Sequence, residues 1–268
     1  MSPAYRPKVN VRTAFISDIH LGTRDCRTDL LLDFLRSVHA DELILVGDIV
    51  DFWSLRRSLY WPQAHSDVLR SLLGKAKYGT RLIYVPGNHD EQLRDVCGSQ
   101  FGLLEVHREY LHETADGRRL LVMHGDEFDA AVKCNRWLAA LGSGLYDVAL
   151  ALNRGVNQMR HRFGYGYWSL ATYLKSRIGN AMQYVHSFEH AAAHTARKRG
   201  LNGIVCGHIH RPEIGDRDGV LYCNSGDWVD SCSALIERRD GQIELWHWAD
   251  LARAELALRG LRDLEHAA

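Results

Sequence analysis

The sequence predicts an α/β fold built around a largely parallel sheet. Short apolar runs rich in β-branched residues alternate with helical stretches over the first part of the chain, and this alternation is typical of parallel sheets. Five such runs end directly at turns that carry His, Asp or Asn. Because ligands bind outside the carboxyl ends of the strands in these sheets, the same pattern predicts where a functional site lies.

Five runs are predicted as buried strands, since each is short, apolar and closed by a turn signal. They cover Val11 to Ser17, Leu43 to Val46, Arg81 to Val85, Leu120 to Met123 and Gly203 to Cys206. The stretches Arg27 to His39 and Asp67 to Lys77 are predicted as helices between the first three strands. Apolar residues recur at helical spacing in the first of them.

The later part of the chain predicts successive antiparallel strands over Val220 to Cys223, Ser233 to Glu237 and Gln242 to Trp248. The first pair would be joined through Asn224-Ser225-Gly226-Asp227 and the second through Arg239-Asp240-Gly241. Asp-Gly is a strong signal for a hairpin. The last stretch, Asp250 to Leu264, has a helical pattern of Leu and Arg.

No convincing strand occurs from Ala130 to Arg199, which is far longer than an ordinary α/β connection. We interpret residues 130–199 as a helical cap insertion, and residues 1–129 and 200–268 as the main domain. Basic residues and aromatic residues are interleaved in the insertion: Arg154, Arg160, His161, Arg162, Lys175 and Arg177 with Phe163, Tyr165, Tyr167, Trp168 and Tyr173.

The composition limits the class of protein and its partners. Lys+Arg and Asp+Glu both number 33 among 268 residues, so no global basic field recruits nucleic acid, and none is expected as a partner. The six cysteines form no CxxC pair, which indicates free thiols in a reducing compartment. No signal peptide or transmembrane pattern is present. We expect a cytoplasmic protein, with peripheral contact to the inner membrane left open.

Five motifs at the predicted strand ends carry the chemistry. They are Asp18-Ile19-His20, Gly47-Asp48-Ile49-Val50-Asp51, Gly87-Asn88-His89-Asp90, His124-Gly125-Asp126 and Gly207-His208-Ile209-His210. Most of them are weak alone, because turns and helix caps use the same residues. The last, with His208 and His210, is stronger, because alternating histidines after a buried strand are uncommon without a metal. Together they offer imidazole, amide oxygen and carboxylate, which suit divalent metals. Two adjacent metals can activate water and hold a phosphoryl group, so the motifs predict a metal-dependent phosphoesterase.

In this order the motifs D-x-H, GDxxD, GNH[DE], HGD and GHxH resemble the calcineurin-like metallophosphoesterase superfamily, from about Val11 to Trp248 outside the insertion. The resemblance implies a four-layered α/β/β/α sandwich with two divalent metal ions. We expect Mn²⁺, with Fe or Zn as alternatives. One metal would be held by Asp18, His20, Asp48 and His210, and the other by Asp48, Asn88, His124 and His208, with Asp48 as the bridge.

The same resemblance implies that His89 is a catalytic residue rather than a ligand. Because it follows a ligand directly, it can reach the leaving oxygen as a general acid. Asp51 and Asp90 are candidates for orienting such histidines. The alternative is that these two carboxylates cap helices or hold turns.

A narrower resemblance, to the UDP-2,3-diacylglucosamine diphosphatase group, comes from residues in and around the motifs. They are Ser17 to Gly22, Asp51-Phe52-Trp53, Met123 to Asp126, Gly207 to Pro212 and Ser225 to Val229. It implies cleavage of a nucleotide-sugar lipid to UMP and 2,3-diacylglucosamine 1-phosphate in lipid A synthesis, with the insertion sheltering acyl chains.

The chain departs from this group at two places. His89 stands where the group commonly carries Arg, and Glu127-Phe128-Asp129-Ala130 stands in place of a Cys-Thr-Asp-Asp run. A phosphodiesterase or phosphatase acting on another nucleotide or a phospholipid head group therefore remains an alternative. The alternative from another class is a non-catalytic scaffold, which the complete ligand set opposes.

Overall fold

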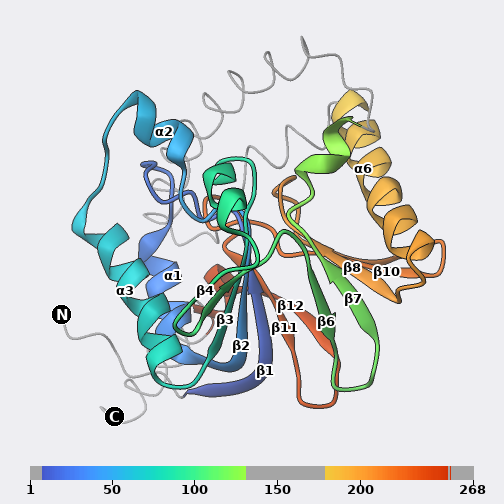
Figure 1. Cartoon of the computed structure of the whole chain (residues 1–268), viewed down its shortest axis with the longest axis horizontal. Coiled ribbons are helices and arrows are strands. Elements are labelled where there is room, and N and C mark those ends of the chain that lie inside the picture. The colour runs from blue at the N-terminus through green and yellow to red at the C-terminus, as the bar shows by residue number, and fades with distance from the viewer. Residues whose placement is uncertain (1–7, 131–178, 253, 255–268) are drawn as a thin grey trace, which may run out of the picture.

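The computed structural model describes residues 8–130, 179–252 and 254, and within them two β-sheets pack face to face. Helices α1 (Thr28–Ser37) and α3 (Gln63–Lys77) cover the outer face of the first sheet. Helix α6 (Gly179–Lys198) covers the outer face of the second (Figure 1). The layers run helix, sheet, sheet, helix, which confirms the predicted four-layer α/β/β/α sandwich.

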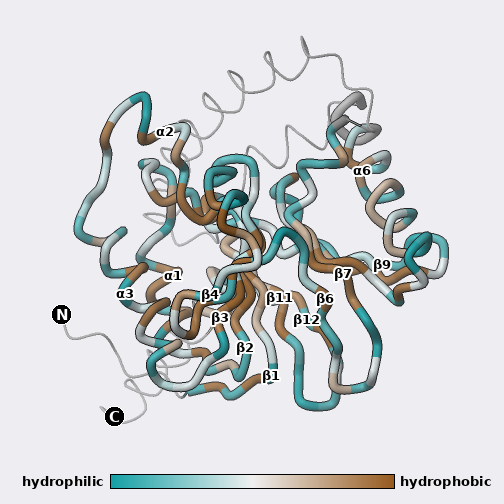
Figure 2. The backbone as a smooth tube through the Cα atoms, in the orientation of Figure 1, coloured by the Kyte–Doolittle hydropathy of each residue, from teal (hydrophilic) through white to brown (hydrophobic). Residues whose placement is uncertain are grey.

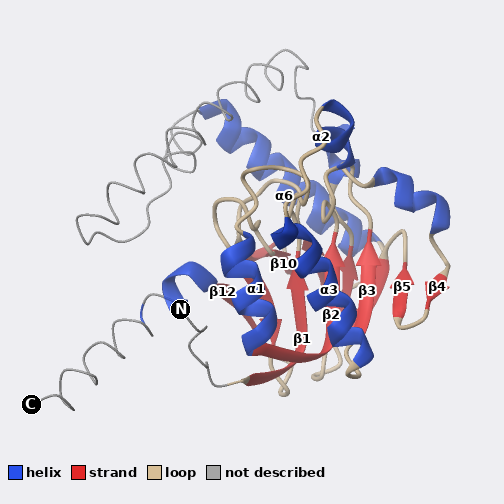
Figure 3. Cartoon of the chain, turned by 90° about the vertical axis from the view of Figure 1, so that its left-hand side faces the viewer, coloured by secondary structure: helices blue, strands red, loops and turns tan. Residues whose placement is uncertain are grey.

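The first sheet has the strand order β12-β11-β1-β2-β3-β5-β4 within the described residues. Strands β1, β2, β3 and β5 are parallel (Figure 3), as expected where helices connect successive strands. The connections also contain α2 (Phe52–Arg57) and the 3₁₀ helix η1 (Glu91–Val96). The strands are β1 (Val9–Ile16), β2 (Val38–Val46), β3 (Arg81–Val85), β4 (Gln100–Phe101), β5 (Leu104–Val106), β11 (Ser233–Glu237) and β12 (Ile243–His247).

The second sheet has the order β6-β7-β8-β10-β9 in the described part of the chain. Its central strands β7, β8 and β10 are parallel, and its edge strands β6 and β9 are antiparallel. A 3₁₀ helix, η2 (Asp126–Ala130), follows β7. The strands are β6 (Tyr110–Glu113), β7 (Arg119–Val122), β8 (Gly203–Cys206), β9 (Glu213–Arg217) and β10 (Val220–Asn224).

Alternation of side chains along the strands builds separate apolar layers. Phe15 and Ile44 lie between the two sheets with Val205, whereas their neighbours Ala14 and Leu43 face the helices of the first sheet. Successive residues of a strand point to opposite faces, so strands covered on both faces are apolar throughout. Figure 2 shows this as hydrophobic colour concentrated on the strands and hydrophilic colour on most connecting loops.

The connection after β10 differs from the prediction. β10 pairs with β8 and β9, whereas β11 pairs with β1 and β12 in the other sheet. The predicted hairpin through Asn224 to Asp227 is therefore wrong, because this stretch crosses between the sheets. Ser17 Oγ lies 2.7 Å from Ser225 Oγ and donates to the carbonyl of Gly226 (2.9 Å), fastening the crossover to the end of β1. The hairpin predicted at Asp240-Gly241 is confirmed by the pairing of β11 with β12.

The helix predicted to end at His39 ends at Ser37 instead. Val38 begins β2 and lies opposite Val9 of β1. Val38 fits both the apolar spacing of the helix and the start of a strand. The periodicity of apolar residues alone therefore does not mark the boundary between α1 and β2.

Most of the predicted insertion, including its interleaved basic and aromatic residues, lies outside the described residues, as does most of the helix predicted over 250–264. The main described part of the insertion is α6. Its residues Phe188, Ala192 and Ala196 are fully buried against the second sheet. This helix is therefore a layer of the sandwich, and the domain boundaries stay a prediction. None of the described helices combines the length and apolar character that a membrane span requires.

Candidate metal centre

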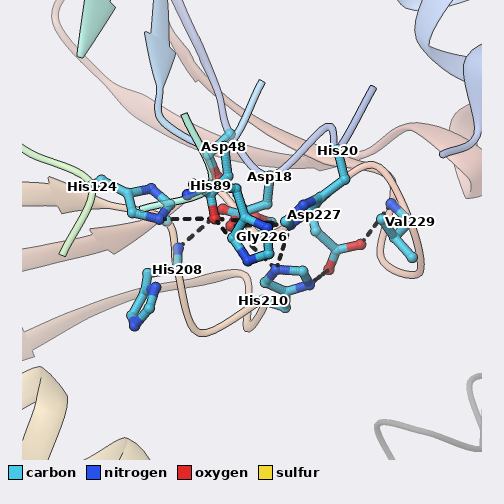
Figure 4. A network of polar contacts seen from close by, with 12 residues as sticks. Asp18, His20, Asp48, His89, His124, His208, His210, Gly226, Asp227 and Val229 are labelled. Atoms are coloured by element: carbon cyan, nitrogen blue, oxygen red, sulfur yellow. Dashed lines mark hydrogen bonds and ion pairs between the residues drawn. The ribbon is translucent and has the colours of Figure 1, made fainter. Parts of the chain in front are cut away.

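The loops that follow β1, β2, β3, β7 and β8 meet at the carboxyl ends of these strands. Figure 4 shows their polar side chains gathered around one region. The structure brings together side chains that are far apart in the sequence and that were predicted as ligands or catalytic groups: Asp18, His20, Asp48, His89, His124, His208 and His210. Asn88 lies in the same loop as His89.

The backbone at this centre is held in an unusual conformation. Five of the predicted ligands have φ between +51° and +67°, namely Asp18, His20, Asp48, His208 and His210. For residues other than Gly this region is disfavoured, and such strain is concentrated at functional sites. The loops approach closely because two of their residues are glycines. A Cβ on Gly87 would lie only 2.2 Å from Asp48 Oδ1, and a Cβ on Gly207 only 2.4 Å from Asp18 Oδ2.

One group of candidate ligands consists of Asp18, His20 and His210. Nε2 of His210 lies 3.2 Å from Asp18 Oδ1 and 3.3 Å from His20 Nε2. The other nitrogen of His20 donates to Asp51 Oδ2 at 3.1 Å. This contact turns Nε2 of His20 toward the group, as an outer hydrogen bond does for metal-binding histidines. One cation can therefore reach all three side chains.

A second group consists of Asp48, His124 and His208. Asp48 Oδ2 lies 3.2 Å from Nε2 of His124, whose Nδ1 donates to the carbonyl of Val46 at 2.9 Å. The same Asp48 oxygen lies 4.0 Å from Nε2 of His20. Asp48 therefore stands between the two groups, where a carboxylate can face both.

The chemistry of the donors fits a divalent metal. Asn88 Oδ1 is a buried atom without a hydrogen-bond partner among the described residues. Such an atom costs ~1–3 kcal/mol when left unpaired, and a cation would satisfy it. Carboxylate oxygen, amide oxygen and imidazole nitrogen together suit Mn²⁺, Fe²⁺ or Zn²⁺.

The charges of the side chains at this centre also suit a cation. Burial opposes the ionised form of Asp48, but His124 and His20 outweigh it and hold its pKa well below the usual range. Burial likewise opposes a charged His20, yet the hydrogen bond to Asp51 and the charge of Asp48 raise its pKa to about 9. Asp48 also raises the pKa of His124 against the effect of burial. Protons on these rings offset the carboxylates, and a bound metal would replace them.

The two carboxylates predicted as orienting groups have different surroundings. Asp51 Oδ2 lies 2.9 Å from His89 Nδ1 and also accepts from His20, while its Oδ1 accepts from Ser54 N at the start of α2. Asp51 therefore contacts both kinds of histidine and caps a helix. His89 is further enclosed by Trp53, whose ring centroid lies 4.3 Å from that of the imidazole.

Asp90 stabilises a turn and does not contact a histidine of the centre. The prediction that it orients a histidine is therefore wrong, and the alternative, that it holds a turn, is confirmed. Its carboxylate accepts from Gly87 N (2.6 Å), Ile49 N (2.8 Å) and the Tyr84 hydroxyl (2.5 Å). Burial and the nearby Asp48 raise its pKa. Asp90 thereby fixes the loop that carries Asn88 and His89.

Two further carboxylates, for which the sequence predicted no role, lie near the centre. Asp129 Oδ1 accepts from Nε2 of His208 at 3.0 Å and also from the hydroxyl of Tyr184. Asp227 Oδ2 lies 3.9 Å from Nδ1 of His210 and its Oδ1 accepts from backbone N–H groups of its own loop. Asp227 lies in one of the stretches that carry the narrower resemblance and Asp129 in a stretch that departs from it, but neither contact has a local signal, because both join distant segments.

Comparison with known proteins agrees with the motifs. A family model described as calcineurin-like phosphoesterase matches residues 11–212. The UDP-2,3-diacylglucosamine hydrolase of Neisseria gonorrhoeae is 28% identical over 247 residues, covering 85% of this chain and 93% of that protein. The protein of the same name from Aliivibrio fischeri is 32% identical over 242 residues, covering 82% of this chain and 92% of that protein.

Among solved structures, a phosphoesterase from E. coli covers 88% of this chain and 98% of its own at 17% identity, with a TM-score of 0.43. The match of the family model extends over most of the sequence and includes all five motifs. The chain therefore belongs to the calcineurin-like phosphoesterase family and is a metal-dependent hydrolase.

Proposed function

We propose that this hydrolase uses two metal ions to cleave the pyrophosphate of UDP-2,3-diacylglucosamine, releasing UMP and 2,3-diacylglucosamine 1-phosphate for lipid A synthesis. The observation that carries the proposal is the similarity to proteins named UDP-2,3-diacylglucosamine hydrolase over 82% to 90% of the chain. The two neighbouring ligand groups support it, because a pyrophosphate presents several charged oxygens that paired cations can neutralise.

The two groups of side chains support the predicted division of the ligands. Asp18, His20 and His210 would hold one ion, and Asn88, His124 and His208 the other, with Asp48 between them. Mn²⁺ is the proposed metal because oxygen and imidazole ligands are mixed, with Fe or Zn as the alternatives. When bound, the two ions supply an activated water and neutralise the phosphoryl oxygens.

We propose that His89 supplies the proton for the leaving oxygen. Its backbone N–H donates to Asp48 Oδ1 at 2.8 Å, which ties the loop to the proposed bridging carboxylate. Asp51 engages Nδ1, and Nε2 lies 4.0 Å from Asp48 Oδ2, on the side of the candidate ligands. A proton held at Nε2 can therefore be delivered to the leaving phosphate oxygen.

The substrate also suggests where the protein acts. The acyl chains of a diacylated sugar nucleotide favour a lipid bilayer, so we propose peripheral contact with the inner membrane from the cytoplasmic side. Anionic vesicles containing the substrate should retain the protein in a flotation assay more than vesicles without it. No difference between the two vesicles would contradict recruitment by substrate.

The decisive test is a product assay with purified protein, Mn²⁺ and UDP-2,3-diacylglucosamine in ¹⁸O-labelled water. Mass spectrometry should detect UMP and the lipid monophosphate, and the label identifies the phosphorus that is attacked. Asp48→Asn is the matched control for contaminating hydrolases. Hydrolysis of a generic aryl phosphodiester without turnover of the lipid would favour the alternative substrates, a nucleotide or a phospholipid head group, which the departure at His89 already suggests.

A further inference from the structure

Helix α6 carries a second cluster of histidines outside the catalytic centre. His186 and His190 are four residues apart, so they lie on adjacent turns of one helix face. Their Nε2 atoms are 3.0 Å apart and their ring centroids 4.2 Å apart. Phe188, midway between them, is fully buried against the second sheet. Because residues two positions apart on a helix point to opposite sides, the two histidines face outward.

The turn between β9 and β10 places a carboxylate beside one of the two rings. Nδ1 of His190 lies 3.3 Å from Oδ2 of Asp218, in the turn between β9 and β10. Nη1 of Arg197 lies 3.8 Å from the same oxygen. A proton on Nδ1 of His190 would face this carboxylate, and the lone pair of Nε2 would then be directed toward His186. Carboxylate–histidine pairs of this kind support metal ligation.

The two Nε2 atoms are at hydrogen-bond distance, and the same separation suits a metal ion whose ligands stand near a right angle. An imidazole nitrogen lies ~2.0–2.1 Å from a divalent transition metal. At this bond length, the separation of 3.0 Å corresponds to a ligand–metal–ligand angle of about 95°. A tetrahedral ion would need the atoms ~3.4 Å apart, whereas a right angle is typical of square-planar or tetragonal sites.

We propose that His186 and His190 form a binding site for Ni²⁺ or Cu²⁺ on the outer face of α6, with Asp218 supporting His190 and water completing the coordination. Such an ion would link two turns of the helix that covers the second sheet. This site is separate from the catalytic centre, since its residues belong to α6 and the β9–β10 turn and to none of the five motifs. Its existence therefore does not depend on the proposed substrate.

The test is calorimetric titration of the Mn²⁺-loaded protein with Ni²⁺, compared among variants. Wild type should bind one more equivalent of Ni²⁺ than His186→Ala and His190→Ala. Asp218→Asn should weaken that binding by ~10–100-fold. His194→Ala is the matched control, because His194 is also exposed on α6 and contacts Arg197 rather than Asp218. Exchange at the catalytic centre occurs equally in all variants and cancels in the comparison.

A second readout uses Cu²⁺, whose paramagnetic resonance spectrum should show coupling to two imidazole nitrogens in wild type and lose it in His186→Ala. Circular dichroism confirms that each variant remains folded, and hydrolysis of an aryl phosphodiester with Mn²⁺ should be unchanged in His186→Ala. Equal Ni²⁺ stoichiometry in wild type and His186→Ala would overturn the proposal, as would loss of the ion in His194→Ala alone.

Discussion

Oδ2 of Asp51 lies 2.9 Å from Nδ1 of His89. The same oxygen accepts a hydrogen bond from His20 at 3.1 Å, so one carboxylate orients a proposed metal ligand and the proposed proton donor. Both rings are further held against each other, with centroids 4.7 Å apart in a T-shaped arrangement. The positions of His20 and His89 are thus coupled through Asp51.

His89→Ala should lower kcat by ~10²–10⁴, the usual range for loss of a general acid, with metal content retained. Asp51→Asn should lower kcat by less, because the amide still has one oxygen that can accept from a ring. The measurement is steady-state hydrolysis of an aryl phosphodiester alongside metal analysis. Loss of metal from His89→Ala would instead make His89 a ligand or a support for one.

Asp48→Asn should nearly abolish turnover and reduce the amount of bound metal. The amide replaces a charged oxygen that faces His20 at 4.0 Å and His124 at 3.2 Å, and an uncharged group binds two cations poorly. Metal analysis after gel filtration and the same hydrolysis assay check both effects. Full activity with normal metal content would refute the bridging role.

Asp129→Ala should weaken metal binding, because the carboxylate that contacts His208 at 3.0 Å is removed. Loss of a carboxylate behind a metal-binding histidine typically costs 10–100-fold in affinity. Competition with a metal-sensitive dye measures the affinity. Tyr184→Phe removes the other hydrogen bond to Asp129 while keeping the carboxylate, so it should have the smaller effect. An unchanged affinity in Asp129→Ala would show that His208 does not need this contact.

Metal binding to the metal-free protein should release protons near pH 7.5. The pKa of His20 is raised from 6.5 to about 9, because Asp51 and the nearby carboxylates outweigh the effect of burial. The ring is then protonated below pH 9 and must lose its proton to bind a metal. Apparent affinity should rise as pH increases from 6.5 toward 9. Calorimetry in two buffers of different ionisation enthalpy counts the protons, and identical heats in both would contradict the prediction.

A buried ion pair between the two sheets should make stability depend on pH. His112 Nε2 donates to Glu237 Oε2 at 2.8 Å, and both side chains are at most 1% exposed. Burial opposes both charges, but the mutual hydrogen bond raises the pKa of His112 above 6.5 and lowers that of Glu237 below 4.5. The His112 contribution is complete below pH 6.5 and is lost as pH rises through the raised pKa. The Glu237 contribution is present above pH 4.5 and is lost as pH falls through the lowered pKa.

His112→Gln should therefore lower the free energy of unfolding by about 1.5–3 kcal/mol between pH 4.5 and 6.5, the typical contribution of a hydrogen bond to a charged group, and by less at higher pH; Glu237 keeps its pair with Arg12 in this variant. Urea unfolding of the metal-free proteins measures the difference. His107→Gln is the matched control, because the pair of His107 with Glu105 is partly exposed, and such pairs contribute less than about 1 kcal/mol. A difference that does not vary with pH would contradict the pKa argument.

The sequence by itself determined the parallel part of the first sheet and the residues of the centre. Each predicted ligand follows a short apolar run, and local periodicity identifies such runs as strands. Since parallel strands carry their carboxyl ends to one edge, strand order along the chain was enough to predict that Asp18, Asp48 and Asn88 meet. The positive φ angles at Asp18 and Asp48 had no signal, because strain of this kind comes from packing.

Only the tertiary structure decided which sheet each later strand joins. The turn at Asn224 to Asp227 has the composition of a hairpin, but Ser17 and Asp18 hold it at the end of β1 and carry the chain into the first sheet. The contacts of Asp129, Asp90 and Asp218 likewise join segments distant in sequence or depend on loop geometry. Local patterns record which residues are strand, helix or turn, whereas hydrogen bonds between distant segments depend on how the layers pack.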